Sequence, residues 1–412
     1  MRYKIKRACL TLACCLQLFA VYCRAWASGY HVLYSFGMHS AGSQNMVFQS
    51  RLTQPESIQL IKSGPVLYGT SSEGGMSNCG TIFSYNLRTG KERVLHSFGW
   101  PLNKVDLSHP TGAMVKRDST LYGVTAGGSG GIFSYNLLTG AETILHSFTP
   151  AQDGAEPVGS LVQSGLVFYG LTSAGGGANA GTIFSCNVKT GAETLLHSFV
   201  GNATDRGVPT AAIIKSGSTL YGVTSRGGTP QQGTIFSFNI QTGTEKVLHI
   251  FGGIGHHDGA NPSGSLLRAG SMLYGLTASG GYLPAKRIFA SGGTLFSYDL
   301  ATGKEKVLYG FGTNALSPFG NLVLSGSTLY GTAFSGGQYT GGYSGGDGSV
   351  FGYNLATGVF TIVHAFDGPH GANPLGGLLL SHGIIYGMTS LGGIHGHGVI
   401  FSLTVPHNTA VK

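Results

Sequence analysis

Short apolar segments, in which large side chains alternate with Ser, Thr or Gly, recur along most of the chain. Gly, Asn and Ser residues separate these segments, and the alternation is typical of half-buried β-strands. Leu/Phe/Ile-Tyr-Gly and a segment typified by GTIFSYN each occur seven times, and a third, typified by VLHSF, occurs six times in the same order. The chain is therefore predicted to be a tandem array of one β-unit.

Each unit is predicted to contain four strands. The first strand is apolar and follows a proline, as in Pro157–Val162, and a Ser-Gly turn leads from it to the Tyr-Gly strand. A Gly-Gly loop then leads to the GTIFSYN strand, and an Asn-Leu-x-Thr-Gly turn leads to the VLHSF strand. Four strands in a unit of 47 to 56 residues are the pattern of a propeller blade.

A seventh copy of the VLHSF segment, His31–Phe36, precedes all the other repeats. The last unit, Pro374–Val405, supplies only three strands, so residues 30–36 are expected to form its fourth, outermost strand. This pairing would close a ring and remove two open sheet edges, whereas a linear array would need polar ends. The sequence predicts an all-β fold, a seven-bladed β-propeller with four-stranded blades.

The composition agrees with a β-rich globular protein. The chain of 412 residues contains 70 Gly but only 24 Lys+Arg and 16 Asp+Glu, while 42% of its residues are hydrophobic. Collagen is excluded because Gly does not recur at every third position. Disorder and long helices are disfavoured because the chain is too apolar for the first and too rich in Gly for the second.

Residues 1–27 are predicted to be a secretory signal peptide, and residues 28–412 a single propeller domain. The first 27 residues hold five of the eight net positive charges and an apolar run, Ala8–Cys23, before Ala25-Trp26-Ala27. The alternative is an uncleaved signal anchor, for which this run is short. Without the signal the chain is nearly neutral, so we expect no nucleic-acid partner, no membrane span in the mature chain, and a secreted, periplasmic or cell-surface location in a bacterium.

Two of the six cysteines, Cys79 and Cys186, lie outside the predicted signal peptide. They cannot form a disulfide scaffold or a CxxC metal site. Cys186 occupies a repeat position that Tyr or Phe fills in most other units, which predicts a buried thiol. A Cys79–Cys186 disulfide is the alternative, and the repeat geometry argues against it.

Loop lengths distinguish the two faces of the predicted ring. The spacing from each GTIFSYN Phe to the Phe that ends the next strand is always 15 residues, whereas the Tyr-Gly to GTIFSYN spacing varies from 11 to 22 residues. The face with the variable loops, called the variable face below, is expected to bind a ligand. Its two long insertions contain three candidate ligand-binding aromatic residues, Tyr282, Tyr339 and Tyr343.

The repeated motifs resemble a known family. The segments Leu67–Gly75, Gly80–Glu92 and Val94–Phe98 resemble the bacterial GloVer tandem repeat and, more distantly, Kelch blades. The GloVer resemblance covers essentially the whole mature chain and implies export, often cell-surface anchoring, and no established reaction. Residues 405–412 contain neither a sorting motif nor an apolar tail, so we expect no attachment to the wall or membrane.

One repeat position with candidate ligand-binding residues lies four residues before each blade-opening proline. It holds Arg51, Asp106, Asp153, Asp205, Asp258, Asn314 and His370. These aspartates either accept backbone N–H groups in Asx-type turns or form a partial ring of carboxylates that binds a cation such as Ca²⁺. We include Asp106, Asp153, Asp205 and Asp258 among the candidate ligand-binding residues. We expect no cofactor, and Ca²⁺ bound by these carboxylates is the alternative.

Histidines occupy the VLHSF position in five units, and Tyr34 and Tyr309 replace them in the other two. A residue that Tyr can replace is expected to pack against the neighbouring sheet rather than bind a metal. Outside this position, His370, His395 and His397 lie in adjacent loops of the last unit and are weak candidates for a Zn²⁺ or Cu²⁺ site.

Catalysis finds little support in the sequence. Nine of the sixteen acidic residues occupy repeat positions, among them Glu92, Glu142, Glu193, Glu245 and Glu305. No sialidase Asp-box, quinoprotein Trp motif or GxSxG elbow is present. We therefore expect an exported, monomeric, non-catalytic propeller that binds a glycan or protein through the variable face. The alternatives are a carbohydrate-active lyase or hydrolase and a structural envelope protein, and a pocket of non-repeated polar residues at the centre of that face would distinguish them.

Overall fold

The repeated segments form the strands that their alternation predicts. The computed structural model describes residues 29–37, 59–99, 107–200, 207–252, 258–283, 288–289, 292–312, 315–337 and 346–406. The predicted signal peptide lies outside these residues. The described residues contain no helix, and hence none that is long and apolar enough to cross a membrane.

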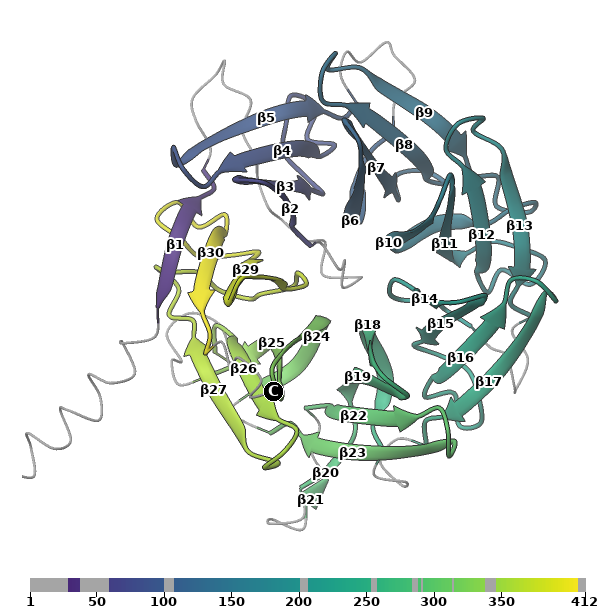
Figure 1. Cartoon of the computed structure of the whole chain (residues 1–412), viewed down its shortest axis with the longest axis vertical. Helices are drawn as coiled ribbons and strands as arrows, with labels where there is room; N and C mark the ends of the chain where they lie inside the picture. The colour runs from purple at the N-terminus through teal and green to yellow at the C-terminus, as the bar shows by residue number, and fades with distance from the viewer. Residues whose placement is uncertain are drawn as a thin grey trace, which may run out of the picture.

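Seven four-stranded antiparallel sheets surround a common centre (Figure 1). In each sheet the strand that follows the proline segment is innermost and the VLHSF strand is outermost. The innermost strands of blades 1 to 7 are β2 (Ile61–Ser63), β6 (Pro110–Arg117), β10 (Ala155–Ser164), β14 (Ile214–Ser216), β18 (Ala260–Ala269), β24 (Ala315–Ser325) and β28 (Leu379–Ser381). The predicted seven-bladed β-propeller is confirmed.

The other strands follow in chain order within each blade. The second strands are β3 (Val66–Ser71), β7 (Thr120–Thr125), β11 (Val167–Ala174), β15 (Thr219–Thr224), β19 (Met272–Ser279), β25 (Thr328–Gly336) and β29 (Ile384–Met388). The third strands are β4 (Thr81–Asn86), β8 (Gly131–Asn136), β12 (Thr182–Asn187), β16 (Thr234–Asn239), β22 (Thr294–Asp299), β26 (Ser349–Asn354) and β30 (Val399–Thr404). The outermost strands are β5 (Lys91–Ser97), β9 (Glu142–Ser147), β13 (Glu193–Ser198), β17 (Thr244–Ile250), β23 (Lys304–Gly310), β27 (Phe360–Ala365) and β1 (Tyr30–Ser35).

The N-terminal strand closes the ring as predicted. β1 pairs antiparallel with β30, with Tyr30 opposite Leu403 and Ser35 opposite Val399. The Phe36 side chain is fully buried in the core shared with blade 1. Because blade 7 combines the first and last strands of the chain, its sheet joins the two ends of the array (Figure 1).

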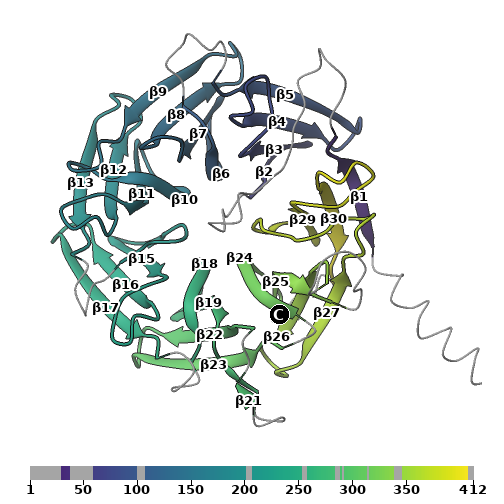
Figure 2. The same cartoon turned by 180° about the vertical axis from the view of Figure 1, so that it is seen from behind.

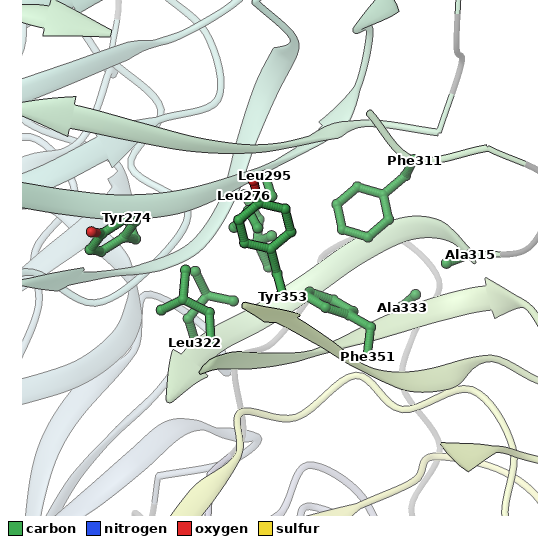
Figure 3. Packing of buried hydrophobic residues seen from close by; sticks show 10 residues of the cluster. Tyr274, Leu276, Leu295, Phe311, Ala315, Leu322, Ala333, Phe351 and Tyr353 are labelled. Carbon is green, nitrogen blue, oxygen red and sulfur yellow. The ribbon is translucent and has the colours of Figure 1, made fainter. Parts of the chain in front are cut away.

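The apolar core lies mostly between neighbouring blades. Between blades 5 and 6, Leu276 and Leu295 pack in one cluster with Phe351 and Tyr353 (Figure 3). The Phe311 ring contacts the Phe351 ring at a centroid distance of 5.1 Å in an edge-to-face arrangement. Each blade is thus stabilised by the apolar surface it buries against the next blade, which a single blade could not bury alone.

Glycine is required where backbones approach one another near the ring centre. Gly264 in β18 has a φ of +73°, and a Cβ atom there would overlap the carbonyl group of Gly320 in β24. Both residues are two positions beyond a blade-opening proline, so the same repeat position brings neighbouring innermost strands into backbone contact. Part of the high Gly content therefore reflects the close approach of the blades.

Both described cysteines are free thiols. The Cys79 Sγ atom donates a hydrogen bond of 3.3 Å to the carbonyl of Ser77, and Cys186 is fully buried between blades. Burial, together with the charge of Glu193, raises the pKa of Cys186 to about 11. The predicted buried thiol is confirmed, and the disulfide alternative is wrong.

Candidate functional site

A cavity of about 510 Å³ lies near the ring centre on the variable face. Its walls are formed by the beginnings of innermost strands and the ends of second strands from blades 2 to 6. Both of these strand ends lie on the variable face, because the connections between blades and the Gly-Gly loops start there. The cavity therefore gathers side chains from five blades that are far apart in the sequence.

The residue directly before the blade-opening proline projects from the same backbone position in each blade but differs in type. This position holds His109, Glu156, Val208, Asn261, Ser317 and Asn373 in blades 2 to 7. Five of the six, all except Val208, adopt a left-handed φ between 50° and 56°, which is costly for a non-glycine residue before proline. Glu156, Val208 and Asn261 line the cavity, so its walls combine a fixed, strained backbone with variable side chains.

Hydrogen bonds hold this strained backbone in place. The backbone N–H of Glu156 donates to the carbonyl of Ser129 at 3.0 Å, and that of Asn261 donates to the carbonyl of Gln232 at 2.7 Å. Each bond links the cavity residue to the Gly-Gly loop of the preceding blade. The side-chain amide of Asn261 also donates to the carbonyl of Ser225 at 3.1 Å. The wall is therefore preorganised by contacts between blades.

The lining contains one acidic and one basic residue among the described side chains. The hydroxyl of Ser173 donates to a carboxylate oxygen of Glu156 at 3.3 Å. Arg226 is exposed and makes no ion pair with any described residue. Phe319, several Ser and Thr hydroxyl groups and small apolar residues such as Val158, Val208 and Ala278 complete the wall. The cavity thus offers a guanidinium group, a carboxylate, hydroxyls and an aromatic ring.

Two of the predicted aspartates lie away from this cavity, toward the outer edge of the ring. The Asp153 carboxylate accepts the backbone N–H of Thr149 at 2.6 Å and contacts His146 Nε2 at 2.8 Å. The Asp258 carboxylate similarly accepts the backbone N–H of Gly252 at 3.0 Å and contacts His249 Nε2 at 3.1 Å. These backbone contacts match the Asx-type alternative. The two aspartates lie in connections that leave different blades, Asp153 after blade 2 and Asp258 after blade 4.

Each aspartate lies near a glutamate of the next blade. Glu193 lies beside Asp153, and Glu305 lies beside Asp258, since the charge of each aspartate affects the corresponding glutamate. Burial and, secondly, the neighbouring aspartate raise the pKa of Glu193 to about 7 and that of Glu305 to about 8. The repeats identified these glutamates only as occupants of a hairpin position and did not indicate that each lies near an aspartate of the preceding connection.

The same two repeat positions also meet between blades where an aromatic residue replaces the histidine, the glutamate or both. Tyr309 of blade 5 stacks on Phe360 of blade 6 with a centroid distance of 3.9 Å. His364 of blade 6 stacks on Tyr30 of blade 7 at 3.6 Å. Histidine and glutamate are both replaced by aromatic rings between blades 5 and 6, whereas His364 keeps its histidine opposite Tyr30, and Tyr34 of blade 7 donates a hydrogen bond of 3.3 Å to Glu92 of blade 1.

The stacked histidine predicts an acid-sensitive contact. Burial is the main reason that the pKa of His364 is lowered from 6.5 to about 4. The unfolded chain therefore binds a proton before the folded chain does, so stability is complete above about pH 6.5 and falls as the pH drops toward 4. His364→Phe keeps the ring stack but cannot bind this proton. Between pH 7 and pH 4.5 the free energy of unfolding is therefore expected to fall less in this variant than in the wild type, and the difference between the two losses should reach up to about 3 kcal/mol.

Urea unfolding at both pH values measures this difference. His146→Phe provides a comparison at the same repeat position, where an aspartate contacts the ring. An identical loss of stability on acidification in the wild type and in His364→Phe would contradict the prediction.

The remaining candidates are not assembled into one site in the described structure. Asp106, Asp205, Tyr339 and Tyr343 lie outside the described residues, and Tyr282 is described only as part of β20 (Tyr282–Leu283). β20 pairs with β21 (Ile288–Phe289), and the two lie beyond β23, away from the ring centre (Figures 1 and 2).

The candidate histidines of the last blade do not form a metal-ligand group in the described structure. His370 bonds through Nδ1 to Asp367 at 2.8 Å and is half exposed. The described residues contain one group of three side chains with metal-ligand atoms within 4.8 Å of one another, and His370, His395 and His397 are not in it.

The fold and its central cavity define a seven-bladed β-propeller with a preorganised pocket on its variable face. The family model of the Gloeobacter/Verrucomicrobia repeat matches residues 21–184, 54–289 and 289–412. The chain therefore belongs to this repeat family. A comparison with curated proteins gave no match.

Several solved structures share the fold. An oligogalacturonate lyase in complex with manganese is 15% identical, with a TM-score of 0.54 over 92% of this chain and 98% of that one. An oligogalacturonate lyase from Vibrio parahaemolyticus is 10% identical, with a TM-score of 0.53 over 92% and 93%. The extracellular domain of a putative one component system from B. thetaiotaomicron is 13% identical, with a TM-score of 0.52 over 88% and 40%. These similarities concern the fold alone.

Proposed function

We propose that this protein is an exported propeller that binds a short glycan in the central cavity of its variable face. The observation that carries the proposal is the gathering of non-repeated polar side chains, Glu156, Arg226 and Asn261, at one cavity. A purely structural disc would need no such convergence. Export rests on the predicted signal peptide.

The chemistry of the lining suits a sugar better than an apolar ligand. Sugar hydroxyls need donors and acceptors, which Ser173, Asn261 and Glu156 provide, and the apolar face of a sugar ring packs on aromatic rings such as Phe319. Arg226 adds a cation that can form paired hydrogen bonds to a carboxylate, as in a uronic acid. Acidic oligosaccharides are therefore the first ligands to test.

The test begins with a glycan array that screens neutral and acidic oligosaccharides for binding. Isothermal titration calorimetry then measures the affinity for each oligosaccharide that binds. Arg226→Ala is expected to weaken binding about tenfold or more, because a charge-assisted hydrogen bond contributes about 1.5–3 kcal/mol. The matched control is Arg88→Ala, which removes an exposed arginine from a turn on the opposite face and should leave affinity unchanged. Absence of glycan binding, or equal losses in both variants, would reject the proposal.

The enzyme alternative is favoured by the presence of Glu156 and Arg226 in the same cavity. A lyase needs a base that removes a proton beside a carboxylate and a cation that stabilises the resulting negative charge. A hydrolase with two carboxylates is less well supported, because Glu156 is the only acidic residue in the described lining. Analysis of the products formed from bound polysaccharides distinguishes a lyase from a binding protein. Glu156→Gln should retain binding in both cases. If the protein is a lyase, the wild type forms products and this variant does not.

A further inference from the structure

Three side chains, from blade 2, the connection that follows it and blade 3, converge near the outer edge of the ring. His146 belongs to β9, Asp153 lies in the connection from β9 to β10, and Glu193 begins β13. Their ligand atoms all lie within 4.8 Å of one another, and His146 Nε2 is 2.8 Å from an oxygen of Asp153. An imidazole nitrogen and two carboxylate oxygens at this spacing form the donor set of a transition-metal site.

The electrostatics of this group favour a bound cation. The carboxylates of Asp153 and Glu193 face one another, and either a proton or a bound cation relieves the repulsion between them. The Glu193 Oε1 atom is buried and accepts no hydrogen bond from the described residues, which is equally true of Glu305 Oε1, so the closer convergence with His146 and Asp153 is what distinguishes Glu193. Such an atom is costly unless a partner is present, and a divalent cation held by His146, Asp153 and Glu193 would supply that partner.

The group is also oriented and reachable. The second oxygen of Asp153 accepts the backbone N–H of Thr149, which fixes the carboxylate. The His146 and Asp153 side chains keep 20% and 14% of their surface exposed, so an ion can enter from solvent. His146 also packs edge-to-face on Phe148, which holds its ring in place.

The interface between blades 4 and 5 holds the same residue types but does not bring them together as closely. His249, Asp258 and Glu305 are all described, yet their ligand atoms do not all lie within 4.8 Å of one another. The chain therefore contains an assembled group and a looser copy of it, and Glu305 offers a matched control for Glu193.

We propose that His146, Asp153 and Glu193 bind one divalent transition-metal ion and that this ion links blade 2 to blade 3. Zn²⁺ is the ion to test first. The site is independent of the central cavity. Imidazole ligation favours Zn²⁺ over Ca²⁺, whose ligands are oxygen atoms. The ion would stabilise the folded ring because it joins groups from two blades that separate on unfolding.

The test is calorimetric titration of metal-free protein with ZnCl₂, together with melting curves in the presence of Zn²⁺, Ca²⁺ or EDTA. Wild type is expected to bind one Zn²⁺ and to melt several degrees higher with it, with no response to Ca²⁺. Glu193→Gln should weaken Zn²⁺ binding at least tenfold, and Glu305→Gln should not. His146→Tyr provides a second variant, because Tyr occupies this repeat position in blades 5 and 7.

Three results would overturn the proposal. One is the absence of any Zn²⁺-dependent rise in melting temperature. Another is a Zn²⁺ response that Glu193→Gln and His146→Tyr leave unchanged, which would place the ion elsewhere. The third is stabilisation by Ca²⁺ but not by Zn²⁺, which would exclude an imidazole ligand.

Discussion

A chain that begins at residue 38 and therefore lacks β1 is expected to lose the cooperative unfolding transition of the full ring. The Phe36 side chain is fully buried, and truncation of such a residue alone costs about 3–5 kcal/mol. The deletion also exposes the edge of β30, whose Phe401 and Leu403 are fully buried. Because whole domains are stable by only about 5–15 kcal/mol, we expect a melting temperature at least 10 °C lower, or aggregation.

Circular dichroism melting and size-exclusion chromatography measure this effect. His31→Ser is the control, because His31 lies on the same strand with an exposed side chain, and it should change stability by no more than about 0.5 kcal/mol. A synthetic peptide of residues 28–38 should restore part of the lost stability by pairing with β30. A truncated chain that melts like the full protein would show that the ring does not depend on this closure.

The second large effect is expected for Gly264→Ala. Its φ of +73° costs a non-glycine residue about 1–2 kcal/mol, and its Cβ would overlap the backbone of Gly320 in the next blade. A backbone group cannot move aside as a flexible side chain can, so the innermost strands of blades 5 and 6 must separate. We expect a total loss of about 3 kcal/mol or more in the free energy of unfolding, measured by urea titration.

Gly270→Ala provides the matched control. Gly270 follows β18, has a similar φ of +62°, and has no atom within 4 Å of a Cβ placed there. This variant should therefore show only the backbone cost of about 1 kcal/mol. Equal losses in the two variants would mean that contact between the innermost strands contributes little.

Much of the fold could be predicted because its information is local and repeated. The alternation in segments such as Gly80–Asn86 indicates strands, and the displaced copy at His31–Phe36 predicts the closing strand that the structure confirms. The exchange of Cys186 with Tyr and Phe likewise predicted its burial. Seven copies of one pattern make each of these inferences stronger than a single copy would.

The sites were harder to predict from the repeats. The sequence drew attention to the position four residues before each proline, where Asp153 and Asp258 stabilise the blade connections. The position directly before the proline, which holds Glu156 and Asn261, lines the cavity instead. Because its residues differ between blades, no shared motif marked this position. The residue types found there also do not predict its left-handed backbone conformation.

The sequence by itself determined the number of blades, the strand order and the closure, since strand periodicity and turn residues act over a few positions. Only the tertiary structure decided which repeat positions meet across the ring and between blades. Thr111 and Phe319 line one cavity, and His146 meets Glu193 of the next blade, because the ring brings distant units together. Such contacts depend on how blades tilt and pack around the centre, and periodicity along the chain does not encode that geometry.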